Sequence, residues 1–420
     1  MTTQLPMTGC LLQREAAHAT HAGAGIAAKA PAAARVLLAA LARIRHGAVL
    51  LQSPDGATAV YGEGAAPITL KLANWKLCGA VLRSGDIGFA ESFIAGDWST
   101  DDLAGLVELL ARNRAELESL VYGSWWGGLL YRVRHLLNRN SRRGSKKNIH
   151  AHYDLGNAFY QRWLDPSMTY SSALFLEPGM SLAQAQAAKY GRILAQLQVE
   201  QGARVLEIGC GWGGFAETAA RGGVHVTGLT LSREQLAYAR ERLAGAGLAA
   251  QADLQLCDYR DSAGQYDAIA SIEMFEAVGQ QYWPDYFACV ARNLKAGGRA
   301  CVQTITIADE LFERYSQGTD FIQQYIFPGG MLPSPAEFRR HAARHGLRVE
   351  QELRFGRDYA ETLRQWRVAF LRERDHIAPL GFDLRFMRTW EFYLAYCEGA
   401  FNAGNTDVMQ FTLVKDWHAD

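Results

Sequence analysis

The stretch that decides the fold is Val205-Leu-Glu-Ile-Gly-Cys-Gly-Trp-Gly-Gly214, in which an apolar strand runs into a glycine-rich loop. Glycine lets the backbone turn sharply there and lets a ligand approach the main chain closely. An acid, Glu207, precedes the first glycine, so the spacing is ExGxGxG and not the GxGxxG of dinucleotide-binding folds. The stretch predicts a ligand-binding turn between a strand and a helix. A plain tight turn and a nicotinamide-binding loop are the alternatives.

Strand-like and helical segments alternate on both sides of this loop. We expect strands over residues 204–208, 224–229, 254–257, 266–272 and 299–305, and helices over 213–221 and 233–244. Such alternation is typical of an α/β fold with a doubly wound, Rossmann-like parallel sheet, in which ligands bind at the carboxyl ends of the strands.

The first part of the chain has a different pattern. We expect a helix over residues 31–44, two strands within 50–61, a strand over 68–72 and a helix over 101–116, whereas residues 84–100 mix glycine, aspartate and aromatic residues. A chain of 420 residues is also longer than is usual for a domain with a single hydrophobic core. The sequence therefore predicts a smaller N-terminal α+β domain associated with lipid or substrate (1–125), a basic linker (126–149) and a catalytic domain (150–420).

Composition excludes several classes of protein. The formal net charge is zero, so no overall field draws the chain to nucleic acid or membrane. The seven cysteines form no CxxC pair and have no metal-ligand spacing, which predicts free thiols in a reducing cytosol and no metal site. No run of about 20 apolar residues and no secretory signal occur, so we expect a cytoplasmic protein.

Residues 125–147 begin with two tryptophans and are strongly basic, without any acidic residue. One interpretation is a solvated linker. The other is a peripheral membrane contact, with aromatic rings at the headgroup boundary and basic side chains on lipid phosphates. Aromatic stacking motifs for nucleic acid are missing, so we expect no nucleic-acid partner. The sequence leaves open whether the chain forms a homodimer.

The ExGxGxG spacing resembles motif I of class I S-adenosylmethionine (SAM) methyltransferases. Further blocks resemble the cyclopropane fatty acid synthase family and follow its order along the chain: 152–157, 168–171, 228–232, 274–279, 325–330 and 398–401. Residues 85–98 resemble the smaller N-terminal domain of that family. The resemblance implies transfer of a methyl or methylene group from SAM to the double bond of an unsaturated fatty acyl chain of a phospholipid, giving a cyclopropane. The carrier of the acyl chain and the position of its alkene stay open.

Cofactor contacts follow from the resemblance position by position. Together with the acid at Glu207, it implies SAM contacts at Tyr170, Ser171, Gly209, Gly211, Thr230, Leu231, Gln235, Asp258, Tyr259 and Arg260.

The catalytic positions match the family only in part. In the family, a bicarbonate held by a Cys, a Glu, a His, a Tyr and a backbone Ile removes the proton. Glu276, Ile305 and Tyr359 fall on three of these positions, but Ser172 replaces the Cys, Gln303 replaces the His, and Glu273 replaces a glycine common in its block. These departures argue against bicarbonate. They leave open methylation without ring closure, to a methyl-branched or methylene chain, and a non-catalytic protein that binds SAM and lipid.

Two carboxylates, Glu273 and Glu276, stand three residues apart after the strand at 266–272. Carboxylates this close raise the pKa of one of them, which makes a better base. We expect Glu276 to be the base and Glu273 to contact SAM or the backbone. Aromatic rings can stabilise the cation formed on the acyl chain. The candidates by proximity to the motifs are Tyr153, Tyr170, Phe275, Tyr282 and Tyr286.

Overall fold

The computed structural model describes residues 25–121 and 155–416, which belong to two compact units. The first unit combines the chain up to residue 131 with residues 384–403, and the second comprises residues 132–383 and 404–420. The basic segment 125–147 and Tyr153 lie outside the described residues, so the membrane contact stays a prediction. Within the described ranges, no helix is long and apolar enough to cross a bilayer.

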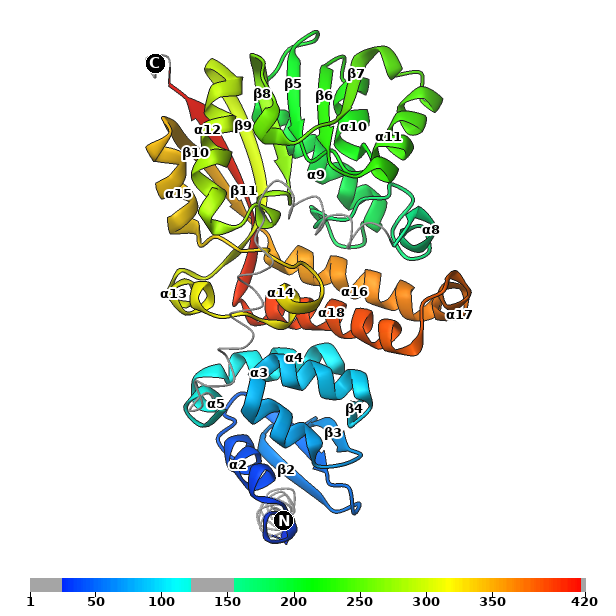
Figure 1. Ribbon diagram of the computed structural model, residues 1–420, viewed down its shortest axis with the longest axis vertical. Coiled ribbons are helices and arrows are strands. Elements are labelled where there is room, and N and C mark those ends of the chain that lie inside the picture. Colours follow the sequence, from blue (N-terminus) through cyan, green and yellow to red (C-terminus); the bar gives the residue numbers. More distant parts are fainter. Residues whose placement is uncertain (1–24, 122–154, 417–420) are drawn as a thin grey trace, which may run out of the picture. The chain divides into compact units, whose positions relative to one another are not determined.

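A 4-stranded sheet in the order β2-β1-β3-β4 forms the centre of the first unit (Figure 1). Strands β1 (Gly47–Gln52) and β2 (Thr58–Glu63) pair antiparallel, β3 (Ile68–Leu72) runs parallel to β1, and β4 (Trp98–Thr100) closes the edge. The helices of this unit are α2 (Ala32–Leu41), α3 (Lys76–Ala95), α4 (Leu103–Arg112), α5 (Arg114–Val121) and α18 (Leu384–Ala403). The predicted α+β pattern is therefore confirmed in its strands. It is also confirmed in the helices expected over residues 31–44 and 101–116, which correspond to α2 and to α4 with the start of α5.

Two helices of this unit differ from the expectation. Residues 84–95 continue helix α3, which is kinked at Ser84 and Gly85 instead of ending there. Helix α18 packs against α3 and α4, and the hydroxyl of Tyr396 donates a hydrogen bond of 2.9 Å to Asp86. The predicted boundary at residue 150 places α18 in the catalytic domain, whereas its contacts group it with the first unit. An amphipathic pattern does not tell which core a helix joins.

The second unit contains a 7-stranded sheet in the order β10-β11-β9-β8-β5-β6-β7. Its strands are β5 (Arg204–Ile208), β6 (His225–Thr230), β7 (Ala252–Leu256), β8 (Tyr266–Ile272), β9 (Leu294–Ile307), β10 (Leu347–Arg354) and β11 (Thr406–Lys415). The neighbouring strands β7, β6, β5, β8 and β9 run parallel, as predicted. Strand β11 runs antiparallel to both of its neighbours. The sheet is thus doubly wound with an antiparallel edge that the local pattern did not indicate.

Helices cover both faces of this sheet (Figure 1). The helices of this unit are α8 (Asn157–Tyr160), α9 (Leu182–Leu197), α10 (Gly214–Arg221), α11 (Arg233–Gly245), α12 (Trp283–Asn293), α13 (Asp309–Gln317), α14 (Phe321–Tyr325), α15 (Pro335–Arg344), α16 (Gly356–Arg372) and α17 (Arg374–Ile377). One core packs α9, α10 and α11 against the sheet, and the other packs α12 and α15 against it.

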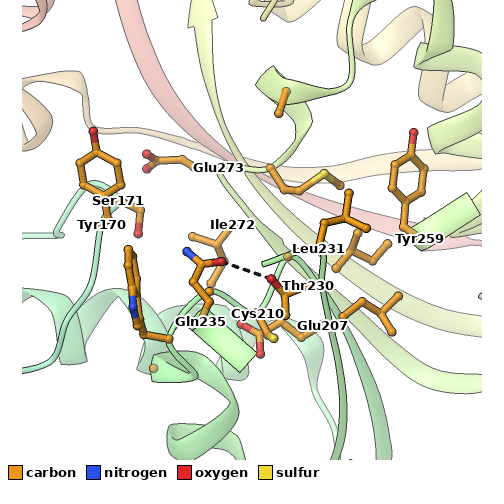
Figure 2. Close-up of a pocket in the computed structure, with 18 of the residues that line it drawn as sticks. Tyr170, Ser171, Glu207, Cys210, Thr230, Leu231, Gln235, Tyr259, Ile272 and Glu273 are labelled. Atoms are coloured by element: carbon orange, nitrogen blue, oxygen red, sulfur yellow. Dashed lines mark hydrogen bonds between the residues drawn. The ribbon is translucent and has the colours of Figure 1, made fainter. Parts of the chain in front are cut away.

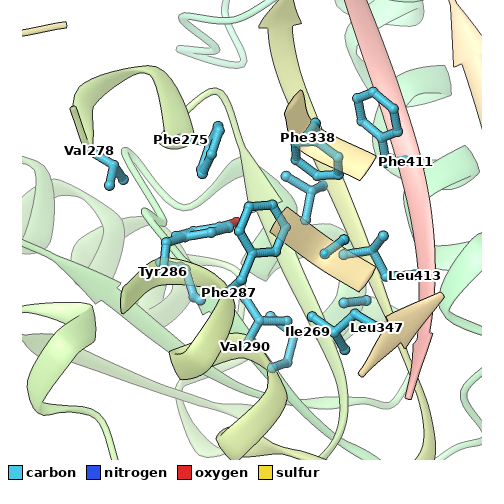
Figure 3. Packing of buried hydrophobic residues seen from close by; sticks show 14 of the residues in the cluster. Ile269, Phe275, Val278, Tyr286, Phe287, Val290, Phe338, Leu347, Phe411 and Leu413 are labelled. Atoms are coloured by element: carbon cyan, nitrogen blue, oxygen red, sulfur yellow. The ribbon is translucent and has the colours of Figure 1, made fainter. Parts of the chain in front are cut away.

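The second core contains two of the aromatic residues suggested as cation-stabilising groups. Phe275 and Tyr286 are fully buried there and pack with Phe287 and Phe338 (Figure 3). Both rings belong to the packing of this core, because neither lines the pocket described below. Of the candidates that the structure describes, Tyr170 lines that pocket.

Candidate active site

The loops that follow β5, β6, β7 and β8 converge on one pocket (Figure 2). Carboxyl ends of neighbouring parallel strands meet at the same edge of a sheet, which brings these loops together. All positions predicted to contact the cofactor line this pocket: Tyr170, Ser171, Glu207, Gly209, Gly211, Thr230, Leu231, Gln235, Asp258, Tyr259 and Arg260.

The glycine loop needs glycine for two different reasons. Gly209 has φ of +88°, and a Cβ atom there would lie 2.8 Å from Cγ of Met274, so packing excludes a side chain. Gly211 has φ of +50°, but a Cβ atom there would meet nothing within 4 Å. Because Gly211 also lines the pocket, the space beside it is available to a ligand.

The side chain of Glu207 has a hydrogen-bond acceptor without a donor at the pocket. Its side chain is 2% exposed, and its Oε2 atom has no hydrogen-bond partner among the residues that the structure describes. Burial raises the pKa of Glu207 to about 8, against the opposing charges of Arg242 and Lys189. A buried carboxylate without a partner is costly. The ammonium group of SAM would supply the missing donor and positive charge.

Polar groups at the ends of β6 and β7 complete the lining. Oγ1 of Thr230 donates to Oε1 of Gln235 at 3.2 Å. Asp258 forms an ion pair of 2.6 Å with Arg260, whose guanidinium group lies over the ring of Tyr259. Hydrogen-bonding groups and an aromatic face suit the hydroxyls and the heterocycle of a nucleoside. The described residues therefore fit SAM.

Lys189 is a residue that the sequence analysis missed. It lies on α9, is fully buried, and donates a hydrogen bond of 2.5 Å from Nζ to Oγ of Ser171. Burial lowers its pKa to about 7, and the carboxylates of Glu273, Asp165 and Glu207 act in the opposite direction. Helix α9 was not predicted, and no motif surrounds this lysine, so only its burial identifies it.

Glu273 accepts three hydrogen bonds at the pocket wall, on the side formed by Tyr170 and Ser171 (Figure 2). The donors are the backbone N of Ser172 at 2.8 Å, Nε2 of Gln303 at 2.7 Å and the hydroxyl of Tyr359 at 2.8 Å. These donors are residues that the family resemblance assigns to bicarbonate. In this chain they bind a carboxylate that belongs to the protein itself.

The backbone of Glu273 adopts a conformation that favours glycine. Its φ is +49°, in the left-handed region, which costs an L-residue about 1–2 kcal/mol. This conformation accounts for the glycine expected at this position. The three hydrogen bonds hold the glutamate there despite the strain, and strain of this kind concentrates at functional sites.

Glu276 has different surroundings. It accepts a hydrogen bond from the backbone N of Ile305 and does not line the pocket. Burial raises the pKa of Glu276 to about 8, and the charge of Glu273 adds to the shift. Burial also raises the pKa of Glu273, while Lys189 and the hydrogen bonds oppose that shift. The predicted catalytic positions thus divide into two groups, one around Glu273 and one around Glu276.

Two relatives are similar to most of the chain. The chain is 40% identical over 346 residues to the tuberculostearic acid methyltransferase UfaA1 of Mycobacterium tuberculosis, covering 80% of each chain. It is 36% identical over 354 residues to the cyclopropane-fatty-acyl-phospholipid synthase of Escherichia coli, covering 83% of this chain and 88% of the relative.

A similar solved structure is the mycolic acid cyclopropane synthase CmaA1 complexed with SAH and CTAB. It has a TM-score of 0.61 and 32% identity, and the match covers 64% of this chain and 98% of that structure. Residues 140–411 match the family model described as mycolic acid cyclopropane synthetase. The chain therefore belongs to the mycolic acid cyclopropane synthetase family and is a methyltransferase with SAM as its cofactor.

Proposed function

We propose that this enzyme methylates the double bond of an unsaturated fatty acyl chain of a phospholipid, and that Glu273 removes the proton that must leave. The observation that carries the proposal is the Glu273 carboxylate at the pocket wall, held by Ser172, Gln303 and Tyr359. The names of the relatives support a fatty acyl substrate, and the Escherichia coli synthase supports a phospholipid carrier.

When bound, SAM supplies an electrophilic methyl group, and its transfer to an alkene leaves a positive charge on the acyl chain. The alkene needs alignment for this step and no base. The proton that leaves afterwards needs an acceptor within hydrogen-bond reach. Three fixed donors hold the Glu273 carboxylate at the pocket, and the buried cation of Lys189 favours its ionised form. Glu273 therefore has the position of a base, and these contacts oppose the effect of burial, which raises its pKa.

We propose that the product is a methyl-branched or methylene chain without a ring, in which the electrons of the C–H bond that loses its proton form a new carbon–carbon double bond. Ser172, Gln303 and Tyr359 are engaged with Glu273, so the donor set that the resemblance links to bicarbonate and ring closure is already satisfied. The name of UfaA1, a methyltransferase, supports an open chain. A cyclopropane is the second candidate, because other relatives are named cyclopropane synthases.

Product analysis tests this proposal. The purified enzyme would be incubated with unsaturated phospholipid vesicles and SAM carrying a deuterated methyl group, in carbon-dioxide-free buffer with or without added bicarbonate. We expect turnover without bicarbonate and a fatty acid that lacks cyclopropyl proton signals in its NMR spectrum. The deuterium content of the new carbon shows where the proton came from, since an open methyl branch keeps all the label and a ring or methylene loses part of it. A cyclopropane formed only with bicarbonate would contradict the proposal, and SAM binding without turnover would indicate the non-catalytic alternative.

The affinity for SAM should depend on pH through Glu207. A bound cation favours the ionised form, so binding releases a proton at pH values below the pKa of about 8. We therefore expect the affinity to rise by ~3–10-fold between pH 6 and pH 8, because linkage limits the slope to tenfold per pH unit. Calorimetry in buffers of different ionisation enthalpy measures the proton release. Glu207→Gln is the control. The amine of SAM still titrates in this variant, but the additional proton release that comes from Glu207 should be lost. An unchanged proton release in the variant would exclude Glu207 as its source.

A further inference from the structure

A row of buried amides connects Glu273 to a cation on helix α9. Gln303 on β9 and Gln410 on β11 are direct cross-strand partners, and both are fully buried. Nε2 of Gln410 donates to Oε1 of Gln303 at 2.9 Å, and Nε2 of Gln303 donates to Glu273 at 2.7 Å. Arg192 on α9, which is partly buried, donates from Nη1 to Oε1 of Gln410.

The two ends of this row determine the orientation of both amides. A guanidinium group has only donors, so Arg192 requires the oxygen of Gln410. The nitrogen of Gln410 must then face Gln303 and requires the oxygen of that amide. The nitrogen of Gln303 is left for Glu273, which as a carboxylate has only acceptors. Donor and acceptor therefore match at every step from the arginine to the carboxylate.

Gln303 is also the point where this row meets the backbone of the site. Its carbonyl oxygen accepts a hydrogen bond of 2.8 Å from the backbone N of Glu273. Its Nε2 lies 3.5 Å from the carbonyl oxygen of Ser172, which provides an acceptor for the second amide hydrogen. A buried amide with all its groups engaged resists rotation, because turning it would break several hydrogen bonds at once.

We propose that Arg192 and Gln410 are positioning residues, which hold the amide of Gln303 with its nitrogen toward Glu273 and so favour the ionised form of that carboxylate. This inference rests on the proposed role of Glu273 as the base. Without Gln410, the oxygen of Gln303 loses its donor, and the amide can turn its oxygen toward the carboxylate. Neither Arg192 nor Gln410 lines the pocket, so both act through Gln303.

Loss of the hydrogen bond from Gln303 to Glu273 has a defined effect on the pH dependence of kcat. A hydrogen bond to the ionised form lowers the pKa of a carboxyl group, so its loss raises that pKa. The base works only when ionised, and the acid limb of kcat should therefore move to higher pH. The other groups that face Glu273 are Lys189 from α9, Tyr359 from α16 and Glu276 on the adjacent turn, and all of them stay in place in the test variants.

The test is the pH dependence of kcat in carbon-dioxide-free buffer. We expect Gln410→Leu to move the acid limb upward by roughly one pH unit, which lowers the rate about tenfold on that limb and leaves the high-pH plateau within about twofold. Arg192→Met, at a partly exposed position, should shift the limb in the same direction by less and serves as the variant that keeps the strand intact.

A matched control and a double mutant separate positioning from packing. Thr412→Val removes another buried hydrogen bond of β11, the one to Gln196, and should leave the acid limb unchanged. In a Gln303→Leu background, Gln410→Leu should cause no further shift, because the residue through which it acts is gone. An unmoved limb in both Gln410→Leu and Arg192→Met, or an equal loss at every pH, would overturn the inference. The inference can fail while Glu273→Gln is inactive and the proposed function stands, whereas an active Glu273→Gln variant would refute the base itself.

Discussion

Glu273→Gln is expected to lower the rate of product formation by ~10²–10⁴-fold, the typical contribution of a general base. Glutamine keeps the size of the side chain and one acceptor oxygen, which can still accept the hydrogen bonds from Ser172 and Gln303, while its amide nitrogen can donate to the hydroxyl of Tyr359. It cannot accept a proton at the pH of the assay. Product formation would be measured by mass spectrometry of the lipids, with SAM affinity measured in parallel to show that the cofactor still binds.

Glu276→Gln is the matched control for that experiment. Burial raises the pKa of Glu276 to about 8, which favours the protonated acid, and glutamine imitates that form. We expect it to lose only a few-fold in rate, since its oxygen can still accept the hydrogen bond from Ile305. The reverse result, with Glu276→Gln inactive and Glu273→Gln nearly active, would return the role of base to Glu276.

Gly211→Val is expected to weaken SAM binding by ~10²-fold or more, because it adds a branched side chain at a left-handed position facing the ligand space. A Cβ atom at Gly211 meets no protein atom within 4 Å, so the new side chain would occupy the pocket and not clash with the fold. Isothermal titration calorimetry measures the affinity, and thermal unfolding measures the stability of the same samples.

Gly247→Val separates the two effects of that substitution. Gly247 has φ of +72° and open space around a Cβ atom, but it does not line the pocket. Both variants should lose a similar free energy of unfolding from backbone strain, and only Gly211→Val should lose affinity. Equal SAM affinity in Gly211→Val and the parent protein would remove the loop from the binding site.

The sequence alone determined the parallel half of the sheet and the edge where the predicted cofactor contacts meet. Residues 204–208 and 266–272 form strands as predicted, because a short and mostly apolar run encodes a buried strand over a short range. The positions predicted to contact SAM follow the ends of several such strands. Parallel pairing brings those ends to one edge, so residues far apart in the chain meet in one pocket.

Tertiary structure decided the rest of the site. Glu273 and Glu276 have the same chemistry and nearly the same place in the chain, and the left-handed backbone at Glu273 contributes to the different placement of the two carboxylates. Lys189 and Arg192 lie on an ordinary amphipathic helix, and Gln410 lies on β11, an inner strand that pairs with β9 more than a hundred residues earlier. No local pattern marks these residues, because their roles depend on which side chains the long-range packing places opposite them.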